Sequence, residues 1–287
     1  MLVSRRRAMK TTREMGGAAE SKGWDHGTHP HFYDYYAAES ESASTRQRFQ
    51  SIQSAILRIA AKLGLPEKLD VADIGCGAGT QARIWARLGH CVRGLDVNEP
   101  LINLARQRAD AEGLSIPFEV GTATALPWPD GSVQVCLLPE LLEHVPDWQA
   151  CLSEAARVLA PGGLLYVSTT NYLCPVQEEF NLPLYSWYPP SLKRHCERLA
   201  TTTRPAIANF AKYPAVHWFS FFLLRDFLQP MKLTCLDRFD LMDRSSKSAP
   251  VRLLLSALTS SRVLRFIGHV CTPSTYFIAV KAREYPR

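Results

Sequence analysis

Residues 71–79 read VADIGCGAG, an apolar run that breaks into three glycines with the spacing G-x-G-x-G. A short apolar run that ends in turn residues is typical of a buried strand. Glycine has no Cβ, so a turn this rich in glycine lets backbone N–H groups come close to a ligand at the start of a helix. The stretch therefore predicts a strand, a tight turn and a helix, with a binding edge at the turn.

Segments typical of strands and of helices alternate on both sides of this turn. The expected strands cover residues 69–75, 91–97, 116–121, 132–138 and 164–170, and the expected helices cover residues 80–88, 100–110 and 148–159. Alternation of this kind implies an α/β fold, with a doubly wound parallel sheet and right-handed crossovers.

The chain divides by pattern into a tail, a cap and one large domain. Residues 1–30 are polar and aperiodic, which predicts a disordered tail. Residues 31–68 contain an amphipathic helix and are interpreted as an N-terminal helical cap. Residues 69–287 make up the α/β domain, in which the proline- and aromatic-rich segment 171–215 interrupts the rhythm after the fifth strand. A loop-rich insertion of this length is typical of a functional lid, here over a substrate.

Regular patterns return after the insertion. Residues 217–228 predict a helix, residues 233–242 a strand, residues 251–270 one further helix and residues 275–283 a closing strand. The two helices are amphipathic, and two interpretations stay open for them. They pack as core-facing helices on the sheet, or they rest on a membrane surface in peripheral contact.

Composition limits the classes of function and location. The net charge of +6 on 287 residues is spread along the chain, which permits an anionic substrate or a membrane surface without requiring nucleic acid. No apolar run approaches the roughly 20 residues needed to span a bilayer. The eight cysteines form no C-x-x-C pair, so we expect reduced thiols, a cytoplasmic location and no metal site.

Asp96 gives the glycine turn a second binding group. It ends the second expected strand, and the carboxyl ends of neighbouring parallel strands meet at one edge of the sheet. A carboxylate has paired acceptor oxygens that suit the two hydroxyls of a ribose. Beside a glycine turn, Asp96 indicates recognition of a nucleoside.

With these features in place, the chain resembles the class I S-adenosylmethionine-dependent methyltransferases, and in particular the group that includes quinone-precursor O-methyltransferases. The resemblance rests on four stretches in the family's order, which together cover roughly residues 69–170. They are VADIGCGAGT, VRGLDVN, GTATALPWPDGSVQVCLLPELLEHV and RVLAPGGLLYVS. The resemblance implies a Rossmann-like sheet of seven strands whose last strand is antiparallel, and S-adenosyl-L-methionine as cofactor.

The resemblance also implies roles for single residues. Gly75, Gly77 and Gly79 would lie beneath the methionine part of the cofactor, and Asp73 would brace their turn. Asp96 would hold the ribose. The adenine would be flanked or read by Val97, Thr122, Ala123 and Leu126. Thr122 departs from the family's pattern, because an Asp is common there; its hydroxyl oxygen can still accept one hydrogen bond.

Methyl transfer to a hydroxyl also needs a group that removes the proton. His144 follows the fourth strand, at the edge where ligands collect in doubly wound folds, and is the first candidate for a catalytic base. It would otherwise only support the cofactor loop. His217 is the second candidate. Tyr185, Trp187 and Tyr188 in the insertion are candidate substrate contacts, although aromatic residues in such a segment often form a small core of their own.

The favoured function is methyl transfer to a hydroxyl oxygen of a small-molecule or lipid- or glycan-linked acceptor, with no nucleic acid as partner. A catalytically silent S-adenosylmethionine-binding partner protein is one alternative. An NAD-dependent oxidoreductase is another; its fingerprint is G-x-G-x-x-G, and here the third glycine comes one residue early. Transfer to RNA is disfavoured, because the sequence has no basic stripe and PELL follows the fourth strand instead of an N-P-P-Y-type motif.

Overall fold

The structure is a computed structural model that describes residues 30–283 except 178, 209–214, 216 and 244–247. The expected tail lies almost wholly outside the described residues. The chain enters through two helices, α1 (Pro30–Glu39) and α2 (Ala43–Lys62). Ser42 separates them because its side chain accepts a hydrogen bond from the Thr45 N–H and so begins α2.

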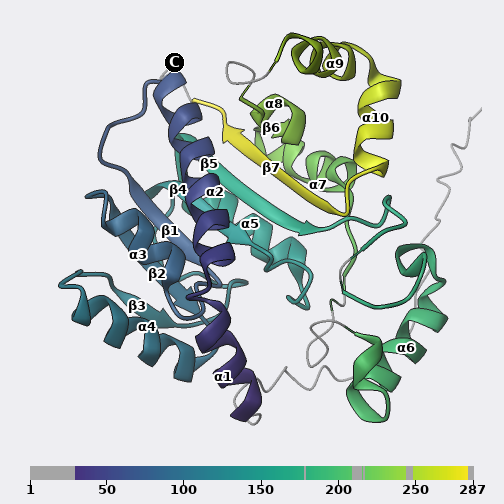
Figure 1. Ribbon diagram of the computed structural model, residues 1–287. Helices are drawn as coiled ribbons and strands as arrows, with labels where there is room; N and C mark the ends of the chain where they lie inside the picture. The colour runs from purple at the N-terminus through teal and green to yellow at the C-terminus, as the bar shows by residue number, and fades with distance from the viewer. Residues whose placement is uncertain (1–29, 178, 209–214, 216, 244–247, 284–287) are drawn as a thin grey trace, which may run out of the picture.

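Seven strands form one sheet, as expected. They are β1 (Asp70–Ile74), β2 (Cys91–Asp96), β3 (Phe118–Val120), β4 (Val133–Pro139), β5 (Leu159–Thr170), β6 (Leu233–Asp237) and β7 (Ser274–Lys281). Their order is β3-β2-β1-β4-β5-β7-β6, and β7 is antiparallel to both of its neighbours. The first five strands are parallel, so their carboxyl ends share one edge (Figure 1).

Helices cover both faces of this sheet. On one face α2, α3 (Thr80–Ala86) and α4 (Glu99–Ala111) bury an apolar cluster, and on the other α5 (Trp148–Val158) and α7 (Phe221–Leu228) bury a second one. Figure 1 shows α2 in front of the sheet and α5 behind it. The side chains of Asn98 and Asp147 cap α4 and α5, which places both helix starts next to strand ends.

The segment after β5 folds as a small unit of short helices. It contains the turns η1 (Tyr185–Trp187) and η2 (Pro205–Ile207) with α6 (Pro190–Thr202) between them. Phe180, Tyr185, Cys196, Ala200 and Ala208 form its own buried cluster. In Figure 1, α6 lies to the side of the sheet and not on it.

Three C-terminal boundaries differ from the expected ones because polar side chains cap helices there. Ser220 caps α7, so residues 217–220 are not helical, and the turn η3 (Gln229–Met231) follows. The strand expected over 233–242 ends at Asp237, which starts α8 (Arg238–Leu241) through a capping box. Ser261 divides the single helix expected over 251–270 into α9 (Ala249–Ser260) and α10 (Arg262–Val270). Within the described residues, no helix has the length and apolar content needed to cross a membrane.

Candidate functional site

The glycine turn follows β1 at the carboxyl edge of the sheet, and all three glycines have positive φ. The Gly75 and Cys76 N–H groups donate to the Leu95 carbonyl at 2.7 and 3.0 Å, which fixes the turn to β2. A Cβ on Gly77 would meet no atom within 4 Å. A Cβ on Gly79 would lie 2.8 Å from Phe118, because the start of α3 packs closely there. Gly77 thus faces open space, and Gly79 serves packing.

Asp96 bridges the turn and the end of β2. Its Oδ2 accepts a hydrogen bond from the Gly77 N–H at 2.8 Å, and its Oδ1 accepts one from the Asn98 N–H at 2.8 Å. A carboxylate has two oxygens with about four acceptor positions, which suits the two hydroxyls of a diol. The arrangement holds the side chain in one orientation beside the open side of Gly77.

Asp73 lies buried beneath this turn. Burial raises its pKa to about 7, and the negative charge of Asp96 adds to the rise. The backbone of Ala82 partly offsets this rise, and among the described residues neither amide atom of the buried Gln81 has a hydrogen-bond partner. Buried polar groups are normally paired in folded proteins. The open space at Gly77, next to the Asp96 carboxylate, fits a nucleoside cofactor.

The expected adenine contacts fall into two groups. Val97 and Thr122 are exposed after β2 and β3, whereas Ala123 and Leu126 are buried in the core cluster around α5. The Thr122 hydroxyl lies 2.8 Å from that of Thr124 and accepts the Thr124 N–H at 3.2 Å, which makes a local turn. Of these four residues, only Val97 and Thr122 are accessible to a ligand from the solvent at the carboxyl edge of the sheet.

The loop after β4 carries the buried carboxyl of Glu143. The Thr169 hydroxyl, near the end of β5, donates to Glu143 Oε2 at 2.8 Å. Burial raises the pKa of Glu143 to about 8, and the nearby charge of Glu140 also raises it. The pair joins the carboxyl ends of β4 and β5, and it holds the loop that contains His144.

Both base candidates meet at this loop. The His217 N–H donates to the Glu143 carbonyl at 3.2 Å, and the His217 ring lies with Nε2 3.1 Å from the Pro146 carbonyl. A carbonyl oxygen only accepts, so Nε2 carries the proton and Nδ1 is the basic nitrogen of the neutral ring. His144 is half-buried, and its backbone N–H donates to the Leu141 carbonyl at 3.0 Å.

The three aromatic residues of the insertion have different surroundings. Tyr185 is completely buried, stacks on Phe180 with 4.1 Å between ring centres, and donates its hydroxyl to Glu197 at 3.4 Å. Tyr188 is half-buried beside it. Trp187 is exposed. Tyr185 therefore belongs to a small separate core, and its expected contact with an acceptor stays a prediction.

The N-terminal helices contact the glycine turn. Tyr33 of α1 packs against Ala78 and Leu101. The Glu41 carboxylate, between α1 and α2, forms ion pairs with Arg83 and with Arg108. These contacts fasten the two helices over α3 and α4, next to the turn.

The sequence interpretation did not single out Thr169, Gln81 or Glu41. Gln81 follows the glycine turn closely enough to have been noticed. Thr169 and Glu41 contact residues that lie 26 and 42 positions away in the chain, so the local sequence pattern carries no signal for them.

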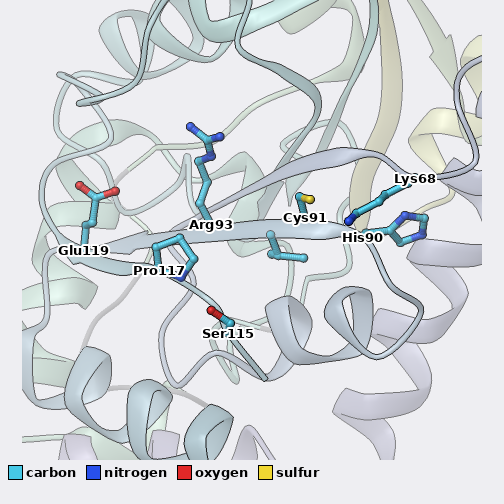
Figure 2. Close-up of a pocket in the computed structure, with 8 residues that line it drawn as sticks. Lys68, His90, Cys91, Arg93, Ser115, Pro117 and Glu119 are labelled. Carbon is cyan, nitrogen blue, oxygen red and sulfur yellow. The ribbon is translucent and has the colours of Figure 1, made fainter. Parts of the chain in front are cut away.

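Figure 2 shows a cavity elsewhere, lined by Lys68, Cys91 and Pro117 among others. It lies at the amino ends of β1, β2 and β3 and is separate from this site.

Comparisons with known proteins identify a family for the central part of the chain. A family described as "Methyltransferase domain" matches residues 72–167. The ubiquinone biosynthesis O-methyltransferase of Rhizobium johnstonii is 37% identical over 105 residues, which are 37% of this chain and 42% of that protein. The enzyme of the same name from Cupriavidus pinatubonensis is 39% identical over 102 residues, or 35% and 41% of the two chains. The match therefore spans less than half the length of these curated relatives.

Solved structures share the fold at low identity. The PH0226 protein of Pyrococcus horikoshii has a TM-score of 0.54 at 16% identity, covering 86% of this chain and 98% of that one. A Burkholderia thailandensis 1,6-didemethyltoxoflavin-N1-methyltransferase with bound S-adenosylhomocysteine has a TM-score of 0.50 at 16% identity, covering 87% and 83%. S-adenosylmethionine is the cofactor that the matched family implies. With the strand order described above, the chain carries a class I S-adenosylmethionine-dependent methyltransferase domain.

Proposed function

We propose that the chain transfers a methyl group from S-adenosylmethionine to a hydroxyl oxygen of a small-molecule or lipid- or glycan-linked acceptor. The observation that carries the proposal is the Asp96 carboxylate, held by the N–H groups of Gly77 and Asn98 beside the open face of the glycine turn. The names of the curated relatives favour oxygen as the methylated atom.

The chain's own residues would bind and orient the cofactor. Asp96 would accept hydrogen bonds from the ribose, and the turn at Gly75, Gly77 and Gly79 would lie beneath the methionine part, braced by Asp73. Val97 and Thr122 would face the adenine from the exposed side. When bound, S-adenosylmethionine supplies a methyl group already activated by its sulfonium. The protein then contributes alignment, which can lower a barrier by roughly 7–11 kcal/mol in favourable cases.

Proton removal from the acceptor is assigned to the loop after β4. His144 is the proposed base, and His217 is the second candidate because its Nδ1 is the basic nitrogen. Glu143 is a positioning residue, since Thr169 and the His217 backbone both bond to it. Trp187 is the exposed aromatic residue that would contact the acceptor, with Tyr188 behind it.

Two alternatives to methyl transfer can each be distinguished by ligand binding. A catalytically silent partner protein would bind S-adenosylmethionine without turnover, and an NAD-dependent oxidoreductase would bind NAD at the same edge. The cytoplasmic location stays a prediction, consistent with eight free cysteines.

The test has a binding arm and a turnover arm. Titration calorimetry with S-adenosylmethionine and with NAD should detect binding of the first alone. Mass spectrometry should then find a methylated product when the protein and labelled cofactor meet a host extract and a panel of phenols. His144→Ala should reduce turnover by at least about 100-fold while cofactor affinity stays unchanged. Full turnover in that variant would transfer the base to His217, which His217→Ala tests; cofactor binding without any product would favour the silent partner.

A further inference from the structure

The helix α10 has its polar and apolar sides reversed relative to a helix that packs on a core. Two of its polar residues point inward: His269 is buried with Nε2 2.9 Å from Asp237 Oδ2, and Arg265 Nε donates to the same oxygen at 2.6 Å. Its apolar residues point outward, with 68% of Val263 and 48% of Ile267 exposed. A helix on the surface of a soluble protein normally shows the opposite arrangement.

Several contacts hold α10 in this orientation. Arg265 also pairs with Asp240, and the His269 ring stacks on Phe221 with 5.0 Å between ring centres. A Cβ on Gly268 would lie 2.5 Å from Phe239, so the helix packs closely there. Rotation about the helix axis would break the ion pairs of the fully buried Asp237. The outward apolar side is therefore built into the fold.

The helix α9 extends the same kind of surface. Leu255 is its buried residue, while 74% of Leu253 and 60% of Leu254 are exposed. Seven large apolar side chains of α9 and α10 are exposed, and together they are called the outer face of these helices: Val251, Leu253, Leu254, Val263, Leu264, Phe266 and Ile267. Figure 1 shows both helices standing at the rim of the molecule, beyond β6 and β7. Gatherings of exposed apolar side chains mark binding surfaces.

Charge indicates what covers this outer face. From Arg244 to Arg283 the sequence contains no Asp and no Glu. Arg252 and Arg262 are exposed among the apolar residues of α9 and α10. Apolar residues combined with cations and no acids suit a bilayer with anionic headgroups, in which an amphipathic helix lies in the interface. A second copy of the face would bring these arginines against each other, which disfavours self-association.

We propose that the outer face of α9 and α10 docks the chain peripherally on an anionic bilayer. The helix α10 also contacts the carboxyl edge of the sheet, where the methyl acceptor would bind. Asn171, directly after β5, donates its side-chain N–H groups to the carbonyls of His269 at 2.8 Å and of Thr272 at 2.7 Å. Docking through α10 would therefore bring the carboxyl edge close to the lipid, within reach of an acceptor with a lipid tail. This last step rests on the proposed function; the docking itself does not.

Flotation of the purified chain with vesicles tests the docking. The protein should float with phosphatidylcholine vesicles that contain phosphatidylglycerol, and high salt should weaken the binding. Replacing Leu253 and Val263 together by Asp should lower the bound fraction by about tenfold or more. Arg252→Gln with Arg262→Gln should remove the preference for phosphatidylglycerol. Leu88→Asp is the matched control, because Leu88 is 59% exposed on the turn after α3.

Three results would overturn the proposal. The wild-type chain fails to float, or the Leu253→Asp, Val263→Asp variant floats as well as wild type. In the third result, the wild-type chain does not bind vesicles and sediments as a dimer, whereas the double variant sediments as a monomer. A second copy of the chain would then be the partner that covers the outer face. Calorimetry with S-adenosylmethionine on the same samples separates the two proposals: lost flotation with intact cofactor binding refutes docking alone, and flotation without cofactor binding refutes the proposed function alone.

Discussion

Two backbone N–H groups, those of Gly77 and Asn98, hold the carboxylate of Asp96 in one orientation. Removing this carboxylate by Asp96→Ala should weaken S-adenosylmethionine binding by about 10- to 100-fold, because both ribose hydroxyls lose their acceptor. Titration calorimetry measures this effect, and circular dichroism checks that the fold is intact. Asp110→Asn is the control, since Asp110 is exposed on α4. Unchanged affinity in a folded Asp96→Ala variant would contradict the assigned role.

Gly77 and Gly79 should respond differently to alanine, although both have positive φ of +48° and +74°. Gly77→Ala meets open space, so it should cost only about 1–2 kcal/mol of unfolding free energy from backbone strain, while it obstructs the cofactor. Gly79→Ala adds a collision with Phe118 and should cost roughly 2–5 kcal/mol. Urea unfolding gives both values. The reverse order, or full cofactor affinity in Gly77→Ala, would contradict the distinction between the two glycines.

Single residues mark the limit of the sequence interpretation. Asp96 and the glycines follow strands directly, so strand pattern alone placed them at one edge. Tyr185 was expected to face an acceptor, yet it is the centre of the cluster with Phe180 and Trp218. Composition shows that such a segment is aromatic but not which rings pack on each other, because those contacts form between positions far apart in the chain.

At the scale of elements, Glu41 connects the N-terminal helices to the α/β domain. It pairs with Arg83, whose side chain is buried, and it accepts the Thr80 hydroxyl at 3.2 Å. Glu41→Gln should lower the free energy of unfolding by about 1–3 kcal/mol, because Arg83 loses one of its two carboxylates and keeps Glu112. Hydrogen exchange should become faster in α1 and in the first turn of α2.

The control for this change is Arg46→Gln. Arg46 is exposed and lies 3.6 Å from Glu41, so its loss should change stability by no more than about 0.5 kcal/mol. Equal effects of the two substitutions, or exchange rates in α1 that do not change with Glu41→Gln, would show that the cap is held by apolar packing alone.

The ends of helices and strands are where the structure differs most from what the hydrophobic pattern of the sequence predicts. The alternation between residues 69 and 170 predicted the five parallel strands, because runs such as β1 and β4 are apolar and buried. The C-terminal elements were harder: Ser261 and Asp237 begin helices within stretches that look continuous by hydrophobicity. A cap depends on one hydrogen bond to the backbone, which a periodicity averaged over many residues does not register.

At the scale of the whole molecule, apolar packing on both faces of the sheet is combined with one buried polar centre. The parallel half is fixed by two apolar clusters on either side of the sheet. The C-terminal part contributes Phe277 and Ile278 to these clusters and adds a polar centre, in which Asp237 is buried with His269 and Arg265 around it. Burial alone would raise the pKa of Asp237, but hydrogen bonds from His269 and Arg265 outweigh it and hold the pKa well below its ordinary value. Composition predicted neither the position of this centre nor the reversed α10 that depends on it.

The protonation of Glu143, which is buried at the carboxyl edge of the sheet, should make the stability of the protein depend on pH. The pKa of Glu143 rises from 4.5 to about 8 on folding because the carboxyl is buried. Between these two values the unfolded chain has released the proton that the folded chain keeps, so the stability contributed by this group falls as pH rises through that window. Glu143→Gln removes the proton exchange, and its amide oxygen can still accept from Thr169.

We therefore expect wild type to lose more thermal stability than Glu143→Gln between pH 6 and pH 8. The extra decrease in melting temperature should be about 4–8 °C, because the group loses roughly 2 kcal/mol between these pH values and each kcal/mol shifts the melting temperature by about 2–4 °C. Scanning calorimetry at both pH values measures it, and Glu67→Gln gives the same substitution at an exposed position. Parallel pH curves for wild type and Glu143→Gln would mean that Glu143 is ionised in the folded protein.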